Sequence, residues 1–161
     1  MIPPDRPLVW ELPRTRRTYQ KGRARMNRAV PCVCIADRNA NVSVFLGRIF
    51  QGRGYETRVA RNCGEVRNLF RDSEPPDLLI YDPEIPCQDS ASALSGLMAD
   101  LPSLPVVLYT HGSDGLDLTI LQRAAALVEK SPDPRALVRT VDHLIRRAYP
   151  GRFPENGRGE D

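Results

Sequence analysis

The sequence predicts an α/β protein, a doubly wound five-stranded parallel sheet in the strand order 2-1-3-4-5 with five flanking helices. Three observations lead to this prediction. Short apolar runs alternate with segments of helical periodicity between residues 31 and 148. One run, residues 78–81, is apolar on both faces, which is typical of parallel strands covered by helices on either side. Several runs end abruptly in a polar residue, at the edge where open α/β sheets bind ligands.

The first half of the pattern holds two strand–helix units. Residues 32–36 form the first strand, and residues 55–59 alternate as an edge strand does. An amphipathic helix lies between them and is closed by Gly52 and Gly54. Its predicted inward residues are Val42, Phe45, Leu46, Ile49 and Phe50. Asn62 caps the next helix with Glu65 three residues later, and the buried stripe of that helix is Val66, Leu69 and Phe70.

The second half begins with the strand at residues 78–81, which Pro83 and Pro86 prevent from continuing. A helical stripe follows at Ala91, Leu94, Leu97, Met98 and Leu101, and residues 104–109 form a continuous apolar strand. A short helix within residues 112–123 leads to a small strand at 125–129. Asp133 as N-cap and Pro134 at the first helical position begin the last helix. Its inward residues are Leu137, Val138, Val141, Leu144 and Ile145.

The strand order follows from these patterns and from the right-handed crossovers that join parallel strands. The alternating strand at 55–59 suits an edge, whereas the strands at 78–81 and 104–109 suit the centre. In the order 2-1-3-4-5 the first and third strands flank the point where the order reverses. Their carboxyl ends carry Asp37 and Asp82.

Length and composition predict one soluble domain. The chain has 161 residues, 41% of them hydrophobic, which supports a single core. No apolar run approaches the roughly 18 residues of a membrane span. Residues 1–28 contain prolines and arginines where a secretory signal needs an unbroken apolar stretch. We therefore expect a cytoplasmic protein without a membrane partner.

The four cysteines are expected to be reduced thiols. Cys32 and Cys34 alternate along a buried strand and should behave as small hydrophobic residues. A metal site that joins them to Cys63 and Cys87 would lack a Cys-x-x-Cys pair and a nearby histidine. The pattern thus favours core packing over a disulfide framework or a thiolate metal site.

Charge is unevenly distributed along the chain. The net charge is +3, and residues 1–28 hold eight basic and two acidic groups, so they carry +6 and the remainder about −3. We expect residues 1–29 to be a flexible basic arm, residues 30–149 the domain, and residues 150–161 a disordered tail. The arm is either a solvated tail, even sequence upstream of a start at Met26, or a binding segment for an acidic partner. The mildly acidic body is a poor candidate for direct nucleic-acid binding.

Four polar residues end four different apolar strands: Asp37, Asp82, Thr110 and Lys130. Because the carboxyl ends of parallel strands emerge on one edge of the sheet, these side chains should meet. Two carboxylates, a hydroxyl and an ammonium together indicate a cation-assisted phosphoryl site. Taken singly, each has a plainer interpretation. Asp82 could initiate a turn before Pro83, Asp37 could be a cap, and the other two could be solvated.

On these residues the chain, from about residue 31 to 148, resembles the receiver domain of two-component response regulators, which has a flavodoxin-like fold. The best-matched segments are Asp82-x-x-Ile85-Pro86, Leu108-Tyr109-Thr110, and Lys130 before a Pro-initiated helix. The resemblance implies that Asp82 accepts a phosphoryl group from a histidine kinase or phosphotransfer protein. It also implies that Lys130 and Thr110 contact the phosphoryl oxygens. It places Mg²⁺ on Asp37, Asp82 and the backbone carbonyl of Glu84.

A receiver of this kind signals through contacts with a downstream effector protein. It is no enzyme beyond self-phosphorylation and self-dephosphorylation, and the sequence indicates a stand-alone receiver, since no further domain follows residue 148. Pairing into a homodimer is left open. A flavin or other small-ligand domain of the same architecture lacks support, because no glycine-rich loop follows the first strand.

The alternative is a pseudo-receiver, an interaction module of the same fold that works without phosphorylation. Departures from the family pattern motivate it. Ala36-Asp37-Arg38 offers one acid where receivers carry two adjacent ones. His111 stands where a very small residue is usual, and Leu127 where an aromatic residue often switches. Arg38 either faces outward or offsets the charge of Asp82 and so gives a metal-independent site.

Overall fold

The computed structural model describes residues 29–152, which form one parallel sheet in the order β2-β1-β3-β4-β5. The predicted strand order and the alternation of strands with helices are confirmed. The strands are β1 (Cys32–Ala36), β2 (Glu56–Ala60), β3 (Leu78–Tyr81), β4 (Val106–Thr110) and β5 (Ala126–Glu129). The helices are α1 (Ala40–Gly52), α2 (Cys63–Arg71), α3 (Ser90–Asp100), α4 (Leu118–Arg123) and α5 (Arg135–Ala148). The predicted basic arm and C-terminal tail lie almost wholly outside the described residues.

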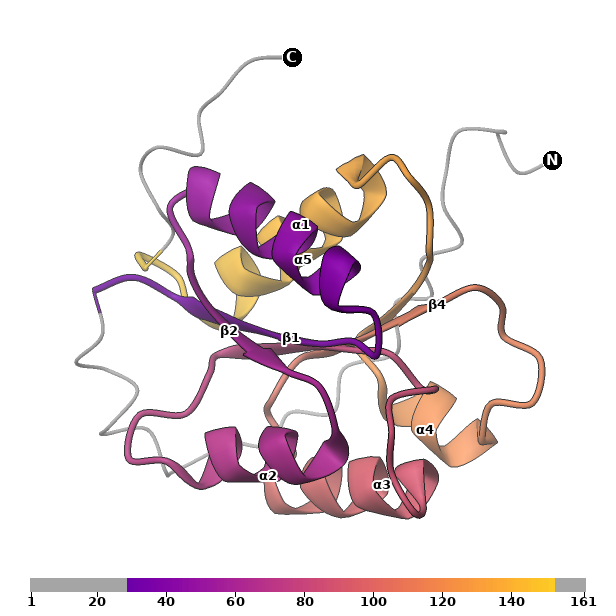
Figure 1. The fold of residues 1–161 in the computed structure, drawn as a ribbon. Coiled ribbons are helices and arrows are strands. Elements are labelled where there is room, and N and C mark those ends of the chain that lie inside the picture. Colours follow the sequence, from indigo (N-terminus) through magenta and orange to yellow (C-terminus); the bar gives the residue numbers. More distant parts are fainter. Residues whose placement is uncertain (1–28, 153–161) are drawn as a thin grey trace, which may run out of the picture.

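The sheet separates two layers of helices, with α1 and α5 on one face and α2, α3 and α4 on the other (Figure 1). Strands β1, β3 and β4 are buried along their whole lengths, because helices cover both of their faces. β2 is partly exposed, as expected of an edge strand. Each face has its own apolar cluster, one centred on Ile35 and Ile80 and the other on Leu79 and Leu108. No helix within residues 29–152 is long and apolar enough to cross a membrane.

Short polar side chains begin several of the helices. Asn39 accepts a hydrogen bond from the backbone N–H of Asn41 at the start of α1. Asn62 accepts one from the N–H of Glu65, and the Glu65 carboxylate accepts one from the N–H of Arg61, so the predicted cap of α2 is present. The prediction for α5 was wrong by one residue, because Pro134 is the N-cap and the helix begins at Arg135. Helix boundaries shift by a residue or two when cap geometry decides them.

The predicted inward face of α1 is wrong at Phe45, which is 47% exposed. The buried face instead holds Ser43, Leu46, Gly47 and Phe50. A Cβ added to Gly47 would lie 3.9 Å from Thr57 Oγ1, an ordinary van der Waals distance, so this face of α1 packs against β2 without requiring glycine there. Apolar spacing alone does not reveal that Ser43 and Gly47 face inward and displace Phe45 outward.

The cysteine prediction is confirmed for one pair and wrong for the other. Cys32 and Cys34 are buried in β1 and form no disulfide, and burial raises the pKa of the Cys34 thiol well above its usual range. Cys63 and Cys87 form a disulfide with a Cα–Cα distance of 5.5 Å. The bond joins the first turn of α2 to the loop after β3, and the backbone N–H of Cys63 also donates to the carbonyl of Pro86. The two segments are 24 residues apart in sequence and meet only because both lie at the carboxyl edge of the sheet.

The disulfide should be visible by alkylation and by stability. We expect denatured, unreduced protein to accept two alkyl groups and reduced protein four. Reduction should lower the free energy of unfolding by about 2–4 kcal/mol, because it releases a closed loop in the unfolded chain. Intact mass and urea unfolding measure the two effects. The Cys63→Ser/Cys87→Ser variant is the control, since its stability should not respond to a reductant. Four alkyl groups on unreduced protein would contradict the bond.

Tyr55 should contribute to stability in a pH-dependent way. Its buried hydroxyl donates a 2.7 Å hydrogen bond to Asp142 Oδ1, and burial together with that carboxylate raises the pKa of Tyr55 well above its usual range. The folded state therefore keeps this proton at pH values above about 10, where the unfolded chain loses it, so stability should fall as the pH rises past about 10. Tyr55→Phe should cost about 1 kcal/mol at neutral pH and flatten that alkaline decline.

Urea unfolding at neutral and alkaline pH measures both changes. Asp142 also pairs with Arg53, so it stays neutralised in the Tyr55→Phe variant. A double-mutant cycle with Asp142→Asn isolates the hydrogen bond from other effects of each substitution. An unchanged alkaline slope in Tyr55→Phe would argue against this assignment.

Candidate functional site

Three of the four predicted strand-end residues meet at the carboxyl edge of the sheet. Lys130 Nζ lies 2.7 Å from Asp37 Oδ2 and 3.3 Å from Asp82 Oδ2. Asp37 follows β1, Asp82 follows β3 and Lys130 follows β5, so parallel strands deliver all three to one place. Their side chains are 2%, 1% and 7% exposed, respectively. Buried charges of this kind are tolerated in proteins when they are paired.

Backbone contacts fix the two carboxylates. The N–H of Asp82 donates to the carbonyl of Ala36, while Asp82 Oδ1 accepts from the N–H of Glu84 at 2.9 Å. Asp37 Oδ1 accepts from the N–H of Asn39 at 2.8 Å. Asp37 Oδ2 has no hydrogen bond of good geometry within the described residues, so its contact with Lys130 is one of charge alone. Asp82 thus has two roles, because its Oδ1 accepts the turn hydrogen bond from Glu84 while its Oδ2 faces Lys130.

Lys130 is held in place by the neighbouring strand. The backbone N–H of Lys130 donates a 2.7 Å hydrogen bond to the carbonyl of Thr110. The Lys130 ammonium lies 5.6 Å from the centre of the Tyr109 ring. Burial raises the pKa of Tyr109, and the nearby Lys130 charge opposes that rise, so the ring keeps its phenolic proton beside the ammonium. The ammonium is thus aimed at the two carboxylates from a rigid strand end.

Thr110 lies at the same edge, but its hydroxyl is bound within its own loop. It donates a 3.0 Å hydrogen bond to the carbonyl of Gly112. No contact joins Thr110 to Asp82 among the interactions of residues 29–152. His111, the next residue, is exposed. The structure therefore places Thr110 near the cluster without bringing it into the cluster.

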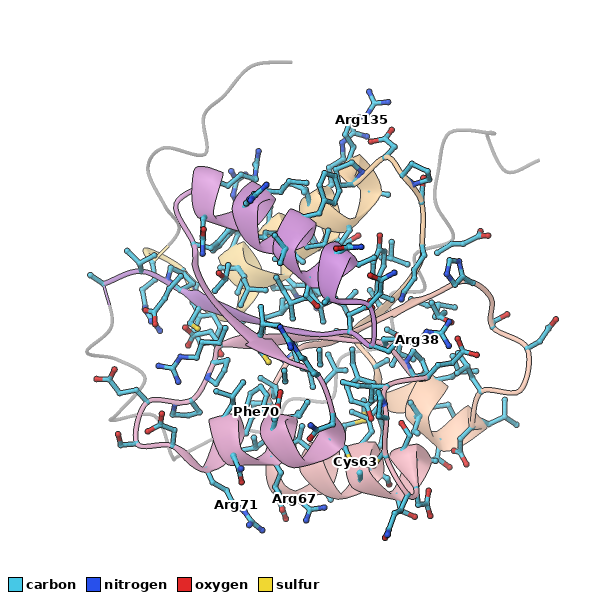
Figure 2. The ribbon with its side chains drawn as sticks, in the orientation of Figure 1. Arg38, Cys63, Arg67, Phe70, Arg71 and Arg135 are labelled. Atoms are coloured by element: carbon cyan, nitrogen blue, oxygen red, sulfur yellow. A yellow bond between two sulfur atoms is a disulfide. The ribbon has the colours of Figure 1, made fainter. Side chains whose placement is uncertain are left out.

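Arg38, which is labelled in Figure 2, comes from the turn after β1. Its side chain turns toward Asp82 instead of facing outward. Its backbone N–H lies 3.4 Å from Asp82 Oδ2, and its Nε lies 3.7 Å from the same oxygen. Its Nη2 lies 2.6 Å from Glu84 Oε2. The Arg38 and Glu84 side chains are 44% and 58% exposed, so the pair covers the outer side of a buried carboxylate. The sequence Ala36-Asp37-Arg38, with its single acid, indicates this role only weakly.

The side chains present do not fit the Mg²⁺ site that the resemblance implies. The implied site has two side-chain ligands, Asp37 and Asp82, and among residues 29–152 no group of three or more His, Cys, Asp or Glu side chains is arranged to hold a metal ion. Asp37 and Asp82 both face the Lys130 ammonium, and Arg38, which pairs with the Glu84 carboxylate, places a second positive group beside Asp82. A hard divalent cation prefers several oxygen ligands and is repelled by two adjacent positive side chains.

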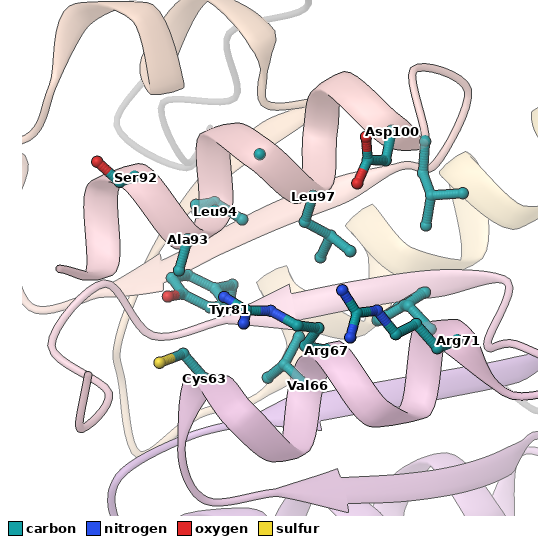
Figure 3. Close-up of a pocket in the computed structure, with 13 residues that line it drawn as sticks. Cys63, Val66, Arg67, Arg71, Tyr81, Ser92, Ala93, Leu94, Leu97 and Asp100 are labelled. Atoms are coloured by element: carbon teal, nitrogen blue, oxygen red, sulfur yellow. The ribbon is translucent and has the colours of Figure 1, made fainter. Parts of the chain in front are cut away.

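A cavity of about 310 Å³ lies away from this cluster, between α2 and α3 (Figure 3). Arg67 and Arg71 reach over it from α2, and Tyr81 lies at its floor. Tyr81 shares a 2.8 Å hydrogen bond with Ser90, and Cys63 is bound in the disulfide. No nucleophile paired with a base lines this cavity, so the chemically competent groups are those at the strand ends.

Sequence comparison relates the chain to a transcriptional regulator. No family model matches the chain. Over 116 residues the chain is 28% identical to the DNA-binding transcriptional regulator NtrC of Proteus hauseri. The match covers 72% of this chain and 24% of that protein, so the chain spans about a quarter of the length of its curated relative.

Structural comparison gives the fold. TrrA, a response regulator of Thermotoga maritima solved with Mg²⁺ and BeF, aligns with a TM-score of 0.65 and 24% identity over 71% of this chain and 99% of TrrA. A CheY-like receiver domain from Methanospirillum hungatei gives 0.64 and 18%, covering 74% and 96%. NtrX of Brucella abortus gives 0.66 and 20%, covering 74% and 28%. The described part of the chain therefore has the receiver-domain, flavodoxin-like fold that the sequence predicts.

The Lys130 ammonium should be necessary for stability. Lys130→Met would leave the buried Asp37 and Asp82 carboxylates without their shared cation, which should cost about 3–5 kcal/mol in urea unfolding. Adding Asp82→Asn should recover part of that loss, because one of the two charges is then removed. Arg139→Met, on the exposed side of α5, is the control and should change stability by less than about 0.5 kcal/mol. A Lys130→Met variant as stable as that control would refute this view of the cluster.

Proposed function

We propose that this chain is a response regulator receiver that accepts a phosphoryl group on Asp82 and signals through contacts with another protein. The observation that carries the proposal is the buried cluster of Asp37, Asp82 and Lys130 at the carboxyl edge of a receiver fold. A carboxylate nucleophile beside a fixed ammonium is suited to phosphoryl transfer, because little covalent chemistry is needed beyond positioning and charge stabilisation.

The transfer step is a simple displacement. An Asp82 oxygen forms a bond to phosphorus while the bond from phosphorus to the donor's histidine nitrogen breaks, and the electron pair stays on that nitrogen. Asp82 is a carboxylate before the step and an acyl phosphate after it. Lys130 then interacts with the added phosphoryl charge, while Asp37 keeps the ammonium oriented. Thr110 would have to release the Gly112 carbonyl before its hydroxyl could reach a phosphoryl oxygen.

The partners in this proposal come from the resemblance. The donor is a histidine kinase or phosphotransfer protein in the cytoplasm, and the recipient of the signal is an effector protein. Magnesium is a familiar ion for such sites, and TrrA was solved with Mg²⁺ and BeF. Since the side chains around Asp82 do not fit the ion in this structure, the experiment below is run with and without Mg²⁺. The proposal concerns the receiver part of the molecule alone, because the match covers only 24% of the curated relative.

A pseudo-receiver is the second candidate, and specific contacts favour it. Asp82 is 1% exposed, and Arg38 paired with Glu84 lies on its outer side. The Thr110 hydroxyl is bound to its own loop. In this reading the cluster is a structural ion pair, and the fold presents a surface to a partner regardless of phosphate.

Phosphorylation by acetyl phosphate separates the two candidates. We expect the wild type to gain one phosphoryl group by intact mass, with amide shifts at Thr110 and Lys130, and Asp82→Asn to gain none. Asp89→Asn is the matched control, since it lies in the same loop and asparagine still caps α3. It should label like the wild type. An unlabelled wild type, with or without Mg²⁺, would favour the pseudo-receiver, whereas equal labelling of Asp82→Asn would place the phosphoacceptor elsewhere.

A further inference from the structure

The geometry points to Arg38 as the built-in cation of the Asp82 site, in the place where the resemblance puts a divalent metal ion. Three contacts carry this inference: the backbone N–H and the Nε of Arg38 face Asp82 Oδ2, and Nη2 pairs with Glu84. The first is a backbone contact that any residue at this position makes, whereas the other two are contacts of the guanidinium itself. The exclusion of metal stands on these contacts, whereas the role of Arg38 during phosphoryl transfer rests on the proposed function.

The charges of the cluster leave little attraction for a metal ion. Three carboxylates, those of Asp37, Asp82 and Glu84, face two cations, Lys130 and Arg38. The site therefore carries a formal charge of about −1, and Asp82 Oδ2 already faces both positive groups. A divalent ion would have to displace the guanidinium and would be repelled by the ammonium. No second acid after β1 is present to offset that repulsion.

A guanidinium is chemically suited to this position. It stays protonated at any physiological pH and presents parallel N–H donors that match two phosphoryl oxygens. Unlike a metal ion, it is covalently attached, so it needs no binding step. Because Arg38 is 44% exposed and Asp82 is 1% exposed, Arg38 is the side chain that moves when a phosphodonor approaches.

The pairing with Glu84 gives this movement a consequence. A phosphoryl group on Asp82 offers Arg38 a stronger anionic partner than the exposed Glu84 carboxylate, so Arg38 transfers to it and releases Glu84. Glu84 lies in the loop after β3, which Cys87 ties to the start of α2. Phosphorylation thus changes the loop next to α2, because Arg38 leaves Glu84 and pairs with the phosphoryl group.

A metal titration tests the exclusion directly and does not depend on phosphorylation. We expect Mg²⁺ at millimolar concentration to produce no saturable amide shifts at Asp37 or Asp82 in the wild type. Arg38→Asp adds a carboxylate next to Asp37 and removes the cation, so it should gain saturable shifts at these positions, with an affinity for Mg²⁺ at least about tenfold higher than that of the wild type. Arg38→Gln removes only the charge and should bind more weakly than Arg38→Asp.

A charge-matched control is available on α1. Arg48→Asp makes the same change in net charge at an exposed residue that contacts neither Asp82 nor Glu84, so it should not gain metal binding. Circular dichroism confirms that each variant is folded before titration. Metal binding by the wild type equal to that of Arg38→Asp, or a folded Arg38→Asp that binds no metal, would overturn the inference.

Phosphorylation with acetyl phosphate tests the second part. The wild type should label equally in Mg²⁺ and in chelator, and Arg38→Gln should label at least about tenfold more slowly in both. Labelling of the wild type only in Mg²⁺ would overturn the role of Arg38 and leave the proposed function intact. No labelling in either condition, together with the expected metal titration, would overturn the proposed function and the transfer role while the exclusion of metal stands.

Discussion

The ammonium of Lys130, placed between two buried carboxylates, is the interaction on which the rest of this edge of the sheet depends. It joins the ends of β1, β3 and β5, three strands that are not consecutive in the sequence. A slip of one residue in any of them would turn its charged group toward the opposite face and leave the other charges unpaired in the interior. The pairing of these charges therefore constrains both the register of the sheet and the geometry of the site. Arg38, the turn after β3 and the loop after β4 are arranged around it.

Much of the fold was predictable because its signals are local and periodic. Strands apolar on both faces, such as Leu78–Tyr81, identify a parallel sheet, and one alternating strand identifies its edge. The positions of Asp37, Asp82 and Lys130 follow from the same rule, since the carboxyl ends of parallel strands share an edge. The face of α1 was harder to predict. A stripe of large apolar residues includes Phe45, but in the folded protein Ser43 and Gly47 are on the buried face and Phe45 is exposed.

The parts that the sequence left undecided depend on side-chain conformation or on meetings between distant segments. Arg38 had two interpretations, because a long side chain after a strand reaches either solvent or a neighbouring carboxylate without any change in the backbone pattern. Thr110 was expected in the cluster, yet its hydroxyl has a nearer acceptor in Gly112. Cys63 and Cys87 carry no spacing signature, and only the folded chain shows that their loops adjoin. In each instance the local sequence permits both outcomes, and tertiary contacts select one.

The Cys63–Cys87 bond also changes what a break in the backbone does to this molecule. It closes a covalent ring over residues 63–87, which contains β3 and the Asp82 carboxylate together with the exposed bend at residues 72–74. Exposed bends are where proteases cut first. A single cut there leaves both pieces of the chain attached through sulfur, with Asp37 on one piece and Asp82 and Lys130 on the other. The nicked protein then stays one covalent molecule until a reductant separates its halves.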